Sequence, residues 1–161
     1  MHPNAHLIES LYTALQQRDG AAMGACYAPT VRFRDPVFAL EGWRVRAMWR
    51  MLCERGKDLR IEFRVLSADD ASGSAHWEAW YTFGATGRPV HNVITADFTF
   101  AAGRIVIHED RFDFHRWAGQ ALGLPGRLLG WVPPFQQAVR RRSAATLEAF
   151  IRKHGLSENT A

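Results

Sequence analysis

The chain has 161 residues, of which 47% are hydrophobic, 12% aromatic and 22% charged, with a formal net charge of +4. These values are typical of one globular domain that buries its own core, and they exclude a disordered or fibrous chain. No recognised nucleic-acid-binding motif accompanies the charge, and no apolar run approaches the roughly 18 residues of a membrane span, so neither nucleic acid nor a membrane is an expected partner.

Two helices are predicted at the start of the chain. Asn4 is a suitable N-cap for a helix over residues 5–18. The apolar residues of this helix recur at helical spacing, which places Tyr12 toward the interior. A second, short helix is expected over residues 21–27, ending near Pro29.

A strand and a third helix follow. Val31 and Phe33 share one face of the strand, which should end at or beside Asp35 because Pro36 cannot donate to a sheet ladder. The third helix is expected over residues 43–55. Its apolar stripe comprises Val45, Met48, Trp49, Leu52 and Cys53.

From residue 59 the hydrophobic period changes to two, which predicts an antiparallel meander of four strands. The expected strands are Leu59–Ser67, Ala75–Phe83, Val90–Phe100 and Arg104–Phe114. In the third strand, one largely apolar face carries Val90, Asn92, Ile94, Ala96, Phe98 and Phe100, and the other face carries His91, Val93, Thr95, Asp97 and Thr99. This pattern indicates a sheet that is covered on one side only.

Residues 117–161 are predicted to form a helical C-terminal extension, broken by glycines and prolines and ending in a helix over residues 135–154. The whole chain, 1–161, is therefore expected to be a single α+β domain. Its curved antiparallel sheet should pack against N-terminal helices, with additional C-terminal helices at one end.

Several segments resemble a known superfamily. Tyr12 in the first helix, then Cys26-Tyr27-Ala28-Pro29 and Val31-Arg32-Phe33-Arg34-Asp35-Pro36, resemble the opening of ketosteroid isomerase and other nuclear-transport-factor-2-like proteins. The later segments WEAWYTF, GRPVHN, GRIVIHEDRFD and RWAGQALG resemble the SnoaL-like branch. The resemblance implies a cone-shaped fold that hosts isomerases, cyclases, hydrolases and modules without a catalytic role.

The resemblance also implies roles for three candidate catalytic residues. Asp35 corresponds to the general base of the isomerase, Tyr12 to the phenol that stabilises an oxyanion, and Asp110 to an acid/base on the last strand of SnoaL-type cyclases. The isomerase has a second acid where this chain has Ala96, which disfavours a steroid-type isomerase. Asn92, on the same face, is a candidate hydrogen-bond donor in its place.

Each of these residues also has a simpler interpretation. Asp35 precedes a proline and suits a turn, and Tyr12 suits plain packing in the core. His108, a further catalytic candidate, lies two residues from Asp110 and so on the same strand face. These two side chains either serve a site or satisfy each other, or they bond Arg111 or Arg116.

Aromatic side chains are numerous enough to line an apolar ligand pocket as well as to fill a core. The candidate ligand-binding residues are Asn92, Trp49, Trp77, Tyr81, Phe83 and Phe112. A metal site built on His108 and Asp110 is disfavoured, because His76 and His91 fall on the opposite side of the sheet. Cys26 and Cys53 are interpreted as small buried hydrophobes.

The leading hypothesis is a cofactor-independent isomerase or cyclase that moves a proton on a small hydrophobic substrate. The alternative is a ligand-binding or protein-assembly module of the same fold without chemistry. An epoxide hydrolase is a third option, but Asp110-Arg111 does not supply the Asp-Arg-Asp relay that this chemistry needs, since adjacent strand residues point oppositely. The family resemblance further predicts a homodimer through the mixed sheet face. The first residues lack the layout of a secretory signal, so a cytoplasmic location is expected.

Overall fold

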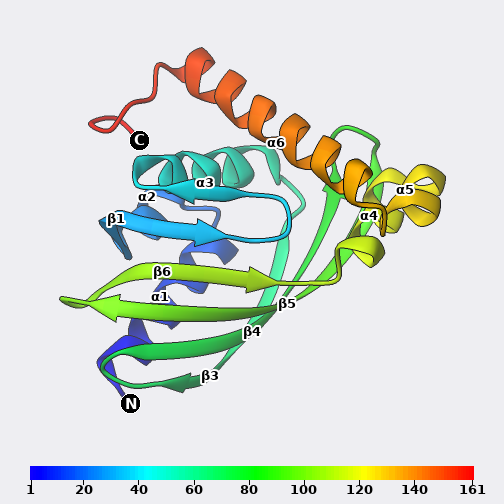
Figure 1. Ribbon diagram of the computed structural model, residues 1–161. Helices are drawn as coiled ribbons and strands as arrows, with labels where there is room; N and C mark the ends of the chain where they lie inside the picture. The colour runs from blue at the N-terminus through cyan, green and yellow to red at the C-terminus, as the bar shows by residue number, and fades with distance from the viewer.

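Six strands form one strongly curved sheet in a computed structural model that describes all 161 residues (Figure 1). The strand order is β2-β1-β6-β5-β4-β3. The strands are β1 (Tyr27–Arg34), β2 (Ala39–Glu41), β3 (Arg60–Ala68), β4 (Ser72–Phe83), β5 (Arg88–Ala101) and β6 (Arg104–Arg111). The helices are α1 (Pro3–Gln16), α2 (Gly20–Ala25), α3 (Trp43–Arg55), α4 (Phe114–Leu122), α5 (Leu124–Leu129) and α6 (Pro133–His154). This is the α+β class that the sequence predicts.

The N-terminal helices cover the inner face of the sheet, and the C-terminal helices lie over one end of it (Figure 1). Along β5 the residues alternate between buried and partly exposed, with Asn92 and the apolar residues on the buried face, as predicted. The other face carries His91 and Thr95 and has no helix over it. The hydrophobic core therefore lies between one side of the sheet and helices α1 and α3.

One strand pair runs parallel in an otherwise antiparallel sheet. β1 pairs antiparallel with β2 on one side and parallel with β6 on the other. Parallel neighbours need a long connection, and here that connection comprises β2, α3 and most of the meander. The three-residue β2 was not predicted, because so short an edge strand has no periodicity of its own.

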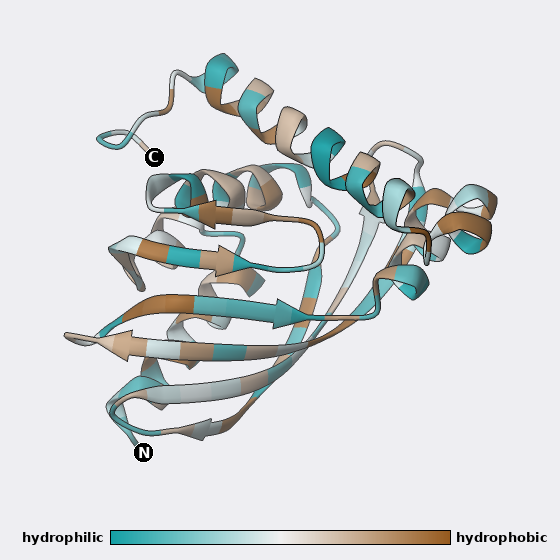
Figure 2. Cartoon of the chain, in the orientation of Figure 1, coloured by the Kyte–Doolittle hydropathy of each residue, from teal (hydrophilic) through white to brown (hydrophobic).

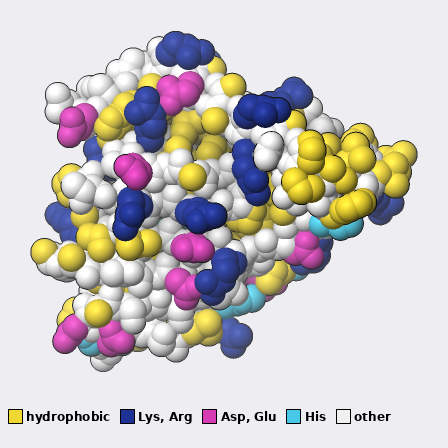
Figure 3. All heavy atoms as spheres, viewed as in Figure 1, with side chains coloured by type: hydrophobic (Ala, Val, Ile, Leu, Met, Phe, Trp, Pro, Cys, Tyr) yellow, Lys and Arg dark blue, Asp and Glu magenta, His cyan; other side chains and the backbone are white.

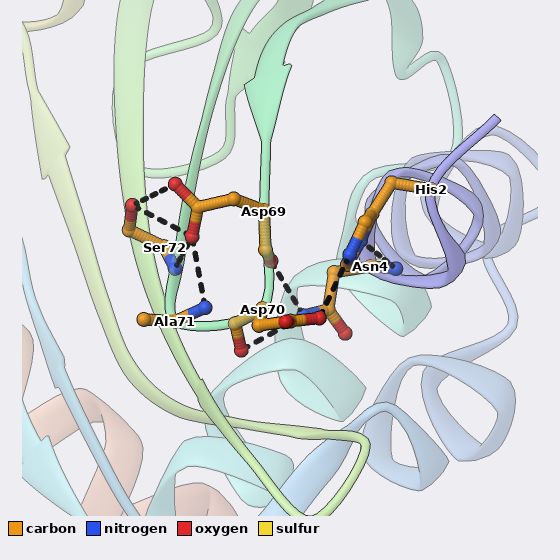
Figure 4. Close-up of polar contacts among 6 residues, drawn as sticks. All are labelled: His2, Asn4, Asp69, Asp70, Ala71 and Ser72. Carbon is orange, nitrogen blue, oxygen red and sulfur yellow. Dashed lines mark hydrogen bonds and ion pairs between the residues drawn. The ribbon is translucent and has the colours of Figure 1, made fainter.

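The start of α1 differs from the prediction. The N-cap is His2, whose Nδ1 accepts the backbone N–H of Asn4 at 3.1 Å. Asn4 lies inside the helix, and its Nδ2 donates to the carbonyl oxygens of Asp69 at 2.8 Å and of Asp70 at 3.3 Å (Figure 4). Asp69 in turn accepts the backbone N–H groups of residues 71 and 72, so the first turn of α1 is tied to the hairpin between β3 and β4.

Two other element boundaries and one buried face also differ from the prediction. Tyr27 begins β1 instead of ending the second helix, because its backbone joins the β6 ladder. Leu52 is exposed on α3, and Met51 is buried in its place. The last strand ends at Arg111, because Asp113 caps a helix that begins at Phe114.

The C-terminal helices make a second, smaller hydrophobic cluster around Trp117 of α4. α6 begins at Pro133, two residues earlier than predicted, with prolines in its first turn where their missing N–H groups cost nothing. It runs back along α3, and Arg44 pairs with Glu148 at 2.8 Å between the two helices. None of the six helices has the length and apolar character needed to cross a membrane.

Candidate active site

A chain of buried polar side chains crosses the inner face of the sheet. His108 and Asp110 on β6 have 0% and 4% of their surface exposed. Nδ1 of His108 lies 2.8 Å from the hydroxyl of Tyr27, and Nε2 lies 2.9 Å from Oδ1 of Asp110. Trp77 of β4 also approaches Oδ1 of Asp110, with its indole N–H at 3.4 Å.

The hydrogen-bond directions follow from the chemistry of the partners. An ionised carboxylate only accepts, so His108 donates its Nε2–H to Asp110 and accepts the Tyr27 O–H at Nδ1. Burial raises the pKa of Tyr27 well above its ordinary value, and the charge of Asp110 raises it further. Tyr27 therefore keeps its proton, which its hydroxyl can donate to Nδ1 of His108.

The strands place these residues through two irregularities. A register shift between Thr99 and Phe100 of β5 lets Ile105 and His108 of β6 both face inward although they are three residues apart. A second register shift lies within β1, between Tyr27 and Arg32, and both Tyr27 and Phe33 are buried on the inner side. Phe33 then lies directly opposite His108 in the parallel pair, with its ring edge toward the imidazole.

Two buried donors near His108 and Asp110 have no hydrogen-bond partner. The hydroxyl of Tyr12 and the indole N–H of Trp49 are both sealed from solvent and make no hydrogen bond of good geometry, although Trp49 lies close enough to the Tyr27 hydroxyl to lower the pKa of that phenol. The Trp49 indole stacks over His108. Burial raises the pKa of Tyr12, and the charge of Asp110 raises it further. The phenol therefore lies near enough to the Asp110 carboxylate to be affected by its charge. Unpaired buried donors are costly and rare, so their position beside a buried acid is characteristic of a functional site.

Two polar groups facing the interior are unpaired but still reached by solvent. Oδ2 of Asp110 makes no hydrogen bond, and the side-chain amide of Asn92 makes none either. Neither group is among the unpartnered side-chain atoms that are sealed from solvent. A small molecule that follows the same path as solvent would therefore meet a free carboxyl oxygen and a free amide.

Asp35 has the turn role that the sequence suggested, and it also faces the interior. Its Oδ1 accepts the backbone N–H groups of Val37 at 2.7 Å and Phe38 at 2.6 Å. Burial raises the pKa of Asp35 to about 7; the two backbone hydrogen bonds oppose this rise and the charge of Asp110 adds to it. A carboxyl with such a pKa is poised to exchange protons near neutral pH.

The predicted aromatic residues divide into two groups. Trp49 and Trp77 lie deep in the main core beside the polar chain. Tyr81, Phe83 and Phe112 are partly exposed and pack around Trp117, whose indole N–H donates to the Tyr81 hydroxyl at 2.8 Å. The second group thus lines the side of the core that faces α4.

Two hollows open on the surface outside the aromatic groups, and Tyr27 borders the second of them. One, of about 530 Å³, lies where β5 begins beside α4 and α5, and the other, of about 540 Å³, lies near α2 and Arg104. Neither is lined by any of the predicted site residues. No three histidine, cysteine or acidic side chains gather in an arrangement that would hold a metal ion. Both cysteines are buried and unpaired, and burial raises the pKa of Cys53 to about 11.

Tyr27 is the site residue that sequence reasoning missed. It belongs to the quoted Cys26-Tyr27-Ala28-Pro29 segment, but its assignment to a helix hid its inward direction. The signal in the sequence is Pro29, since the residue directly before a proline, Ala28, favours extended backbone and so ends the helix before the strand. The structure brings His108, Asp110, Trp77, Trp49 and Tyr12 together, and it bonds His108 to Asp110 instead of either to Arg111, which pairs with Asp97 on the outer face.

Comparison with known proteins places the fold. The sequence profile of the SnoaL-like domain matches residues 8–108, which is more than half of the chain. No curated protein matches it. Among solved structures, an LEH-like epoxide hydrolase from Mycobacterium tuberculosis is 21% identical with a TM-score of 0.59, covering 81% of this chain and 96% of its own.

Two further structures have the same architecture. A protein with a ketosteroid isomerase-like fold from Catenulispora acidiphila, solved with trimethylamine, is 13% identical with a TM-score of 0.63, covering 79% of this chain and 97% of its own. A proposed polyketide cyclase from Xanthomonas campestris is 20% identical with a TM-score of 0.60, covering 73% and 96%. At these identities the likeness shows a common fold with the nuclear-transport-factor-2-like and ketosteroid isomerase-like proteins. Taken with the profile match over residues 8–108, it means that this chain belongs to the SnoaL-like family.

Proposed function

We propose that the chain is a cofactor-independent enzyme of the isomerase or cyclase type, which moves a proton on a small hydrophobic substrate beside Asp110. One observation carries the proposal: a buried carboxyl with one free oxygen lies among buried donors that make no hydrogen bond of good geometry. The comparisons support it only to the level of the family, whose fold serves several reactions.

In the proposed reaction Asp110 is the base. Its Oδ1 is occupied by His108 and Trp77, while Oδ2 is free to take a proton from a carbon next to a carbonyl group. The electron pair moves to the carbonyl oxygen, and the hydroxyl of Tyr12 donates to the oxyanion that forms. Return of the proton to another carbon gives an isomer, and attack of the new carbanion on a second carbonyl gives a ring.

His108 is a positioning residue in this proposal. Both of its ring nitrogens are already bonded, one to Tyr27 and one to Asp110. It therefore has no free nitrogen for a substrate, but it holds the Asp110 carboxyl in one orientation and supports its charge. This modifies the sequence-based hypothesis, in which His108 itself was a candidate acid or base.

Asp35 is the second proton-transfer group. Its pKa of about 7 leaves it part protonated near neutral pH, so it can donate or accept a proton there. Asn92 adds an amide that is free to bond the substrate. The remaining lining is aromatic, which favours a hydrophobic substrate.

Binding requires side chains to move. The hydroxyl of Tyr12 is sealed by its own ring neighbours, Phe63 at 5.3 Å and Trp77 at 5.4 Å between ring centroids. Phe63 is only partly buried whereas Trp77 is buried, so we expect Phe63 to move more readily than Trp77 when a ligand binds. Rotamer changes of this size are common when small ligands bind.

The test compares Asp110→Asn with Asp97→Asn on a panel of β,γ-unsaturated ketones, linear polyketone esters and epoxides. The amide in Asp110→Asn keeps an acceptor for His108 and Trp77 but cannot take a proton, so kcat should fall at least about 100-fold. Asp97 lies on the outer face of the same sheet, and its variant should retain full turnover. Wild-type turnover by Asp110→Asn would reject the assignment.

The alternative function is a ligand-binding or assembly module without chemistry. The mutual bonding of His108 and Asp110 favours it, since a structural pair needs no substrate. The substrate panel separates the two, because a module without chemistry turns over none of the compounds. Carboxyl NMR titration should place the midpoint of Asp35 near 7 in either case, since burial raises its pKa. Asp110→Asn should lower the Asp35 midpoint by removing a nearby negative charge.

The same Asp35 pKa predicts a pH dependence of stability. Between pH values of about 4 and 7 the folded carboxyl keeps a proton that the unfolded chain has lost, so the free energy of unfolding falls as the pH rises through this window. Asp35→Asn keeps the acceptor for Val37 and Phe38 and should remove that fall. Urea denaturation at several pH values measures it.

Epoxide hydrolysis is not the proposed reaction, although one structural neighbour is an LEH-like epoxide hydrolase. That chemistry needs an arginine between two aspartates. Asp110 contacts His108 and Trp77, and Arg111 is engaged with Asp97 on the far side of the sheet. Epoxide turnover in the panel above would reverse this judgement.

A further inference from the structure

The short helix α5 has its large apolar side chains on the outside. Its inner side is made by glycines: a Cβ on Gly126 would clash with the carbonyl oxygen of Ala118 in α4, and Gly130, just past the helix, is similarly enclosed. Leu124, Leu128, Leu129 and Trp131 face outward with 64%, 61%, 46% and 66% of their surface exposed. An ordinary surface helix buries such residues. We call these four residues the α5 tip.

The α5 tip lies at the end of the molecule farthest from the termini. α4 and α5 extend beyond the edge of the sheet (Figure 1), and α5 is coloured strongly hydrophobic although it lies on the surface (Figure 2). In the space-filling view the apolar side chains form one protruding group with basic side chains around it (Figure 3). The other exposed large apolar residues, Met1, Leu52 and Leu66, are outside this segment.

The chain around the tip is uniformly basic. Between Asp113 and Glu148 there is no acidic residue, whereas there are five arginines: Arg116, Arg127, Arg140, Arg141 and Arg142. A segment with this charge attracts an anionic surface and repels a second copy of itself. A two-fold contact between tips would bring like charges together.

The hollow of about 530 Å³ adjoins the tip and is also basic. Arg88, Arg116, Arg127 and His115 contribute to its lining. Its one acid, Asp113, caps α4 by accepting the backbone N–H of Arg116. Guanidinium groups around a concave surface bind phosphate well, because each offers several N–H donors in one plane.

These observations together favour a lipid bilayer over a protein groove. The tip is convex, and the indole N–H of Trp131 already donates to the carbonyl oxygen of Leu128 at 3.1 Å, so its ring can enter an apolar phase without an unpaired donor. Tryptophan and leucine beside arginines are the residues that surface-binding proteins place at the lipid interface.

We propose that the α5 tip inserts into the surface of an anionic phospholipid membrane, with headgroup phosphates held by Arg116 and Arg127 in the adjoining hollow. The chain docks on the membrane and does not cross it, and this proposal differs from the sequence-based expectation that a membrane is not a partner. This proposal is independent of the reaction proposed above, since none of the α5 tip residues belongs to the candidate active site.

The test is flotation of the full chain with vesicles of phosphatidylglycerol and phosphatidylcholine, compared with phosphatidylcholine alone. We expect binding to the anionic vesicles that weakens with salt. Leu128→Ser and Trp131→Ser should each reduce it about tenfold by removing buried apolar surface, and Leu66→Ser, an exposed leucine on β3, should not. Arg127→Gln should reduce it about fivefold, and Arg152→Gln, near the far end of α6, should not.

Four outcomes would overturn the proposal. The first is the absence of wild-type binding to anionic vesicles. The second is unchanged binding by Leu128→Ser, provided that its circular dichroism and melting temperature match those of the wild type. The third is a dimer in sedimentation that Leu128→Ser disrupts while vesicles remain unbound, which would assign the tip to contact between copies. The fourth is binding of glycerol phosphate without vesicle binding, which would reduce the hollow to a site for free anions.

Discussion

At the scale of single residues, two buried tyrosines differ in whether the hydroxyl has a hydrogen-bond partner, and this difference has opposite effects on stability. The hydroxyl of Tyr27 bonds His108 at 2.8 Å, whereas the hydroxyl of Tyr12 bonds nothing, although both rings are buried. A buried hydroxyl without a partner costs about 1–3 kcal/mol, and a bonded one contributes about 1 kcal/mol. The unpartnered hydroxyl of Tyr12 therefore costs stability where a phenylalanine would not.

This difference gives a paired prediction. Tyr12→Phe should raise the free energy of unfolding by about 1 kcal/mol, and Tyr27→Phe should lower it by a similar amount. Urea denaturation of both variants measures the two signs. If Tyr12 serves the proposed reaction, Tyr12→Phe is also less active, which is the usual trade-off at a functional site. A stability loss in Tyr12→Phe would mean that an ordered water or a hidden partner already satisfies its hydroxyl.

The sequence located most of the candidate site but not its connections. The two-residue spacing of His108 and Asp110 was enough to place both on one face, and the helical stripe was enough to turn Tyr12 and Trp49 inward. The bond between Tyr27 and His108 joins residues 81 positions apart. Such a pairing depends on which strands become neighbours, and no local periodicity carries that information.

At the scale of elements, periodicity predicted well wherever a segment has one buried face. α3 has the predicted bounds, and the faces of β5 are as predicted, because each buries a single continuous side. The prediction failed where tertiary contacts decide the local structure. β2 exists only through its pairing with β1, and α5 has its leucines outside because glycines occupy its contact with α4. A hydrophobic pattern alone would have turned α5 the other way.

At the scale of the whole molecule, the outer face of the sheet is uncovered in the isolated chain. The rings of Trp80 and His91 stack there, with 4.4 Å between their centroids, and Val93 and Thr95 lie on the same face. All four residues are partly exposed. A sheet face of this mixed character suits a partner of the same kind, and we propose that it forms the homodimer that the family resemblance implies.

Val93→Arg tests the dimer. At a two-fold interface the new arginine would face its own copy or lie unpaired, so the variant should be monomeric while the wild type is dimeric at micromolar concentration. Sedimentation velocity distinguishes the two states. Thr13→Arg, at an exposed position of α1 away from this face, is the matched control. A wild-type monomer throughout would reject this interface.

The parallel pairing of β1 with β6 has a consequence for how the protein is made. On a ribosome, β1 emerges early, but its parallel neighbour β6 is synthesised only after β3, β4 and β5. Until then its partner edge is open, and the carboxylate of Asp110 has not yet been enclosed. The meander can collapse on its own during synthesis, whereas closure of the cone comes last. Ribosome-bound chains should therefore remain sensitive to protease at β1 until Arg111, the last residue of β6, has cleared the exit tunnel. A codon that is translated slowly once Arg111 has left the tunnel would give β1 and β6 time to pair.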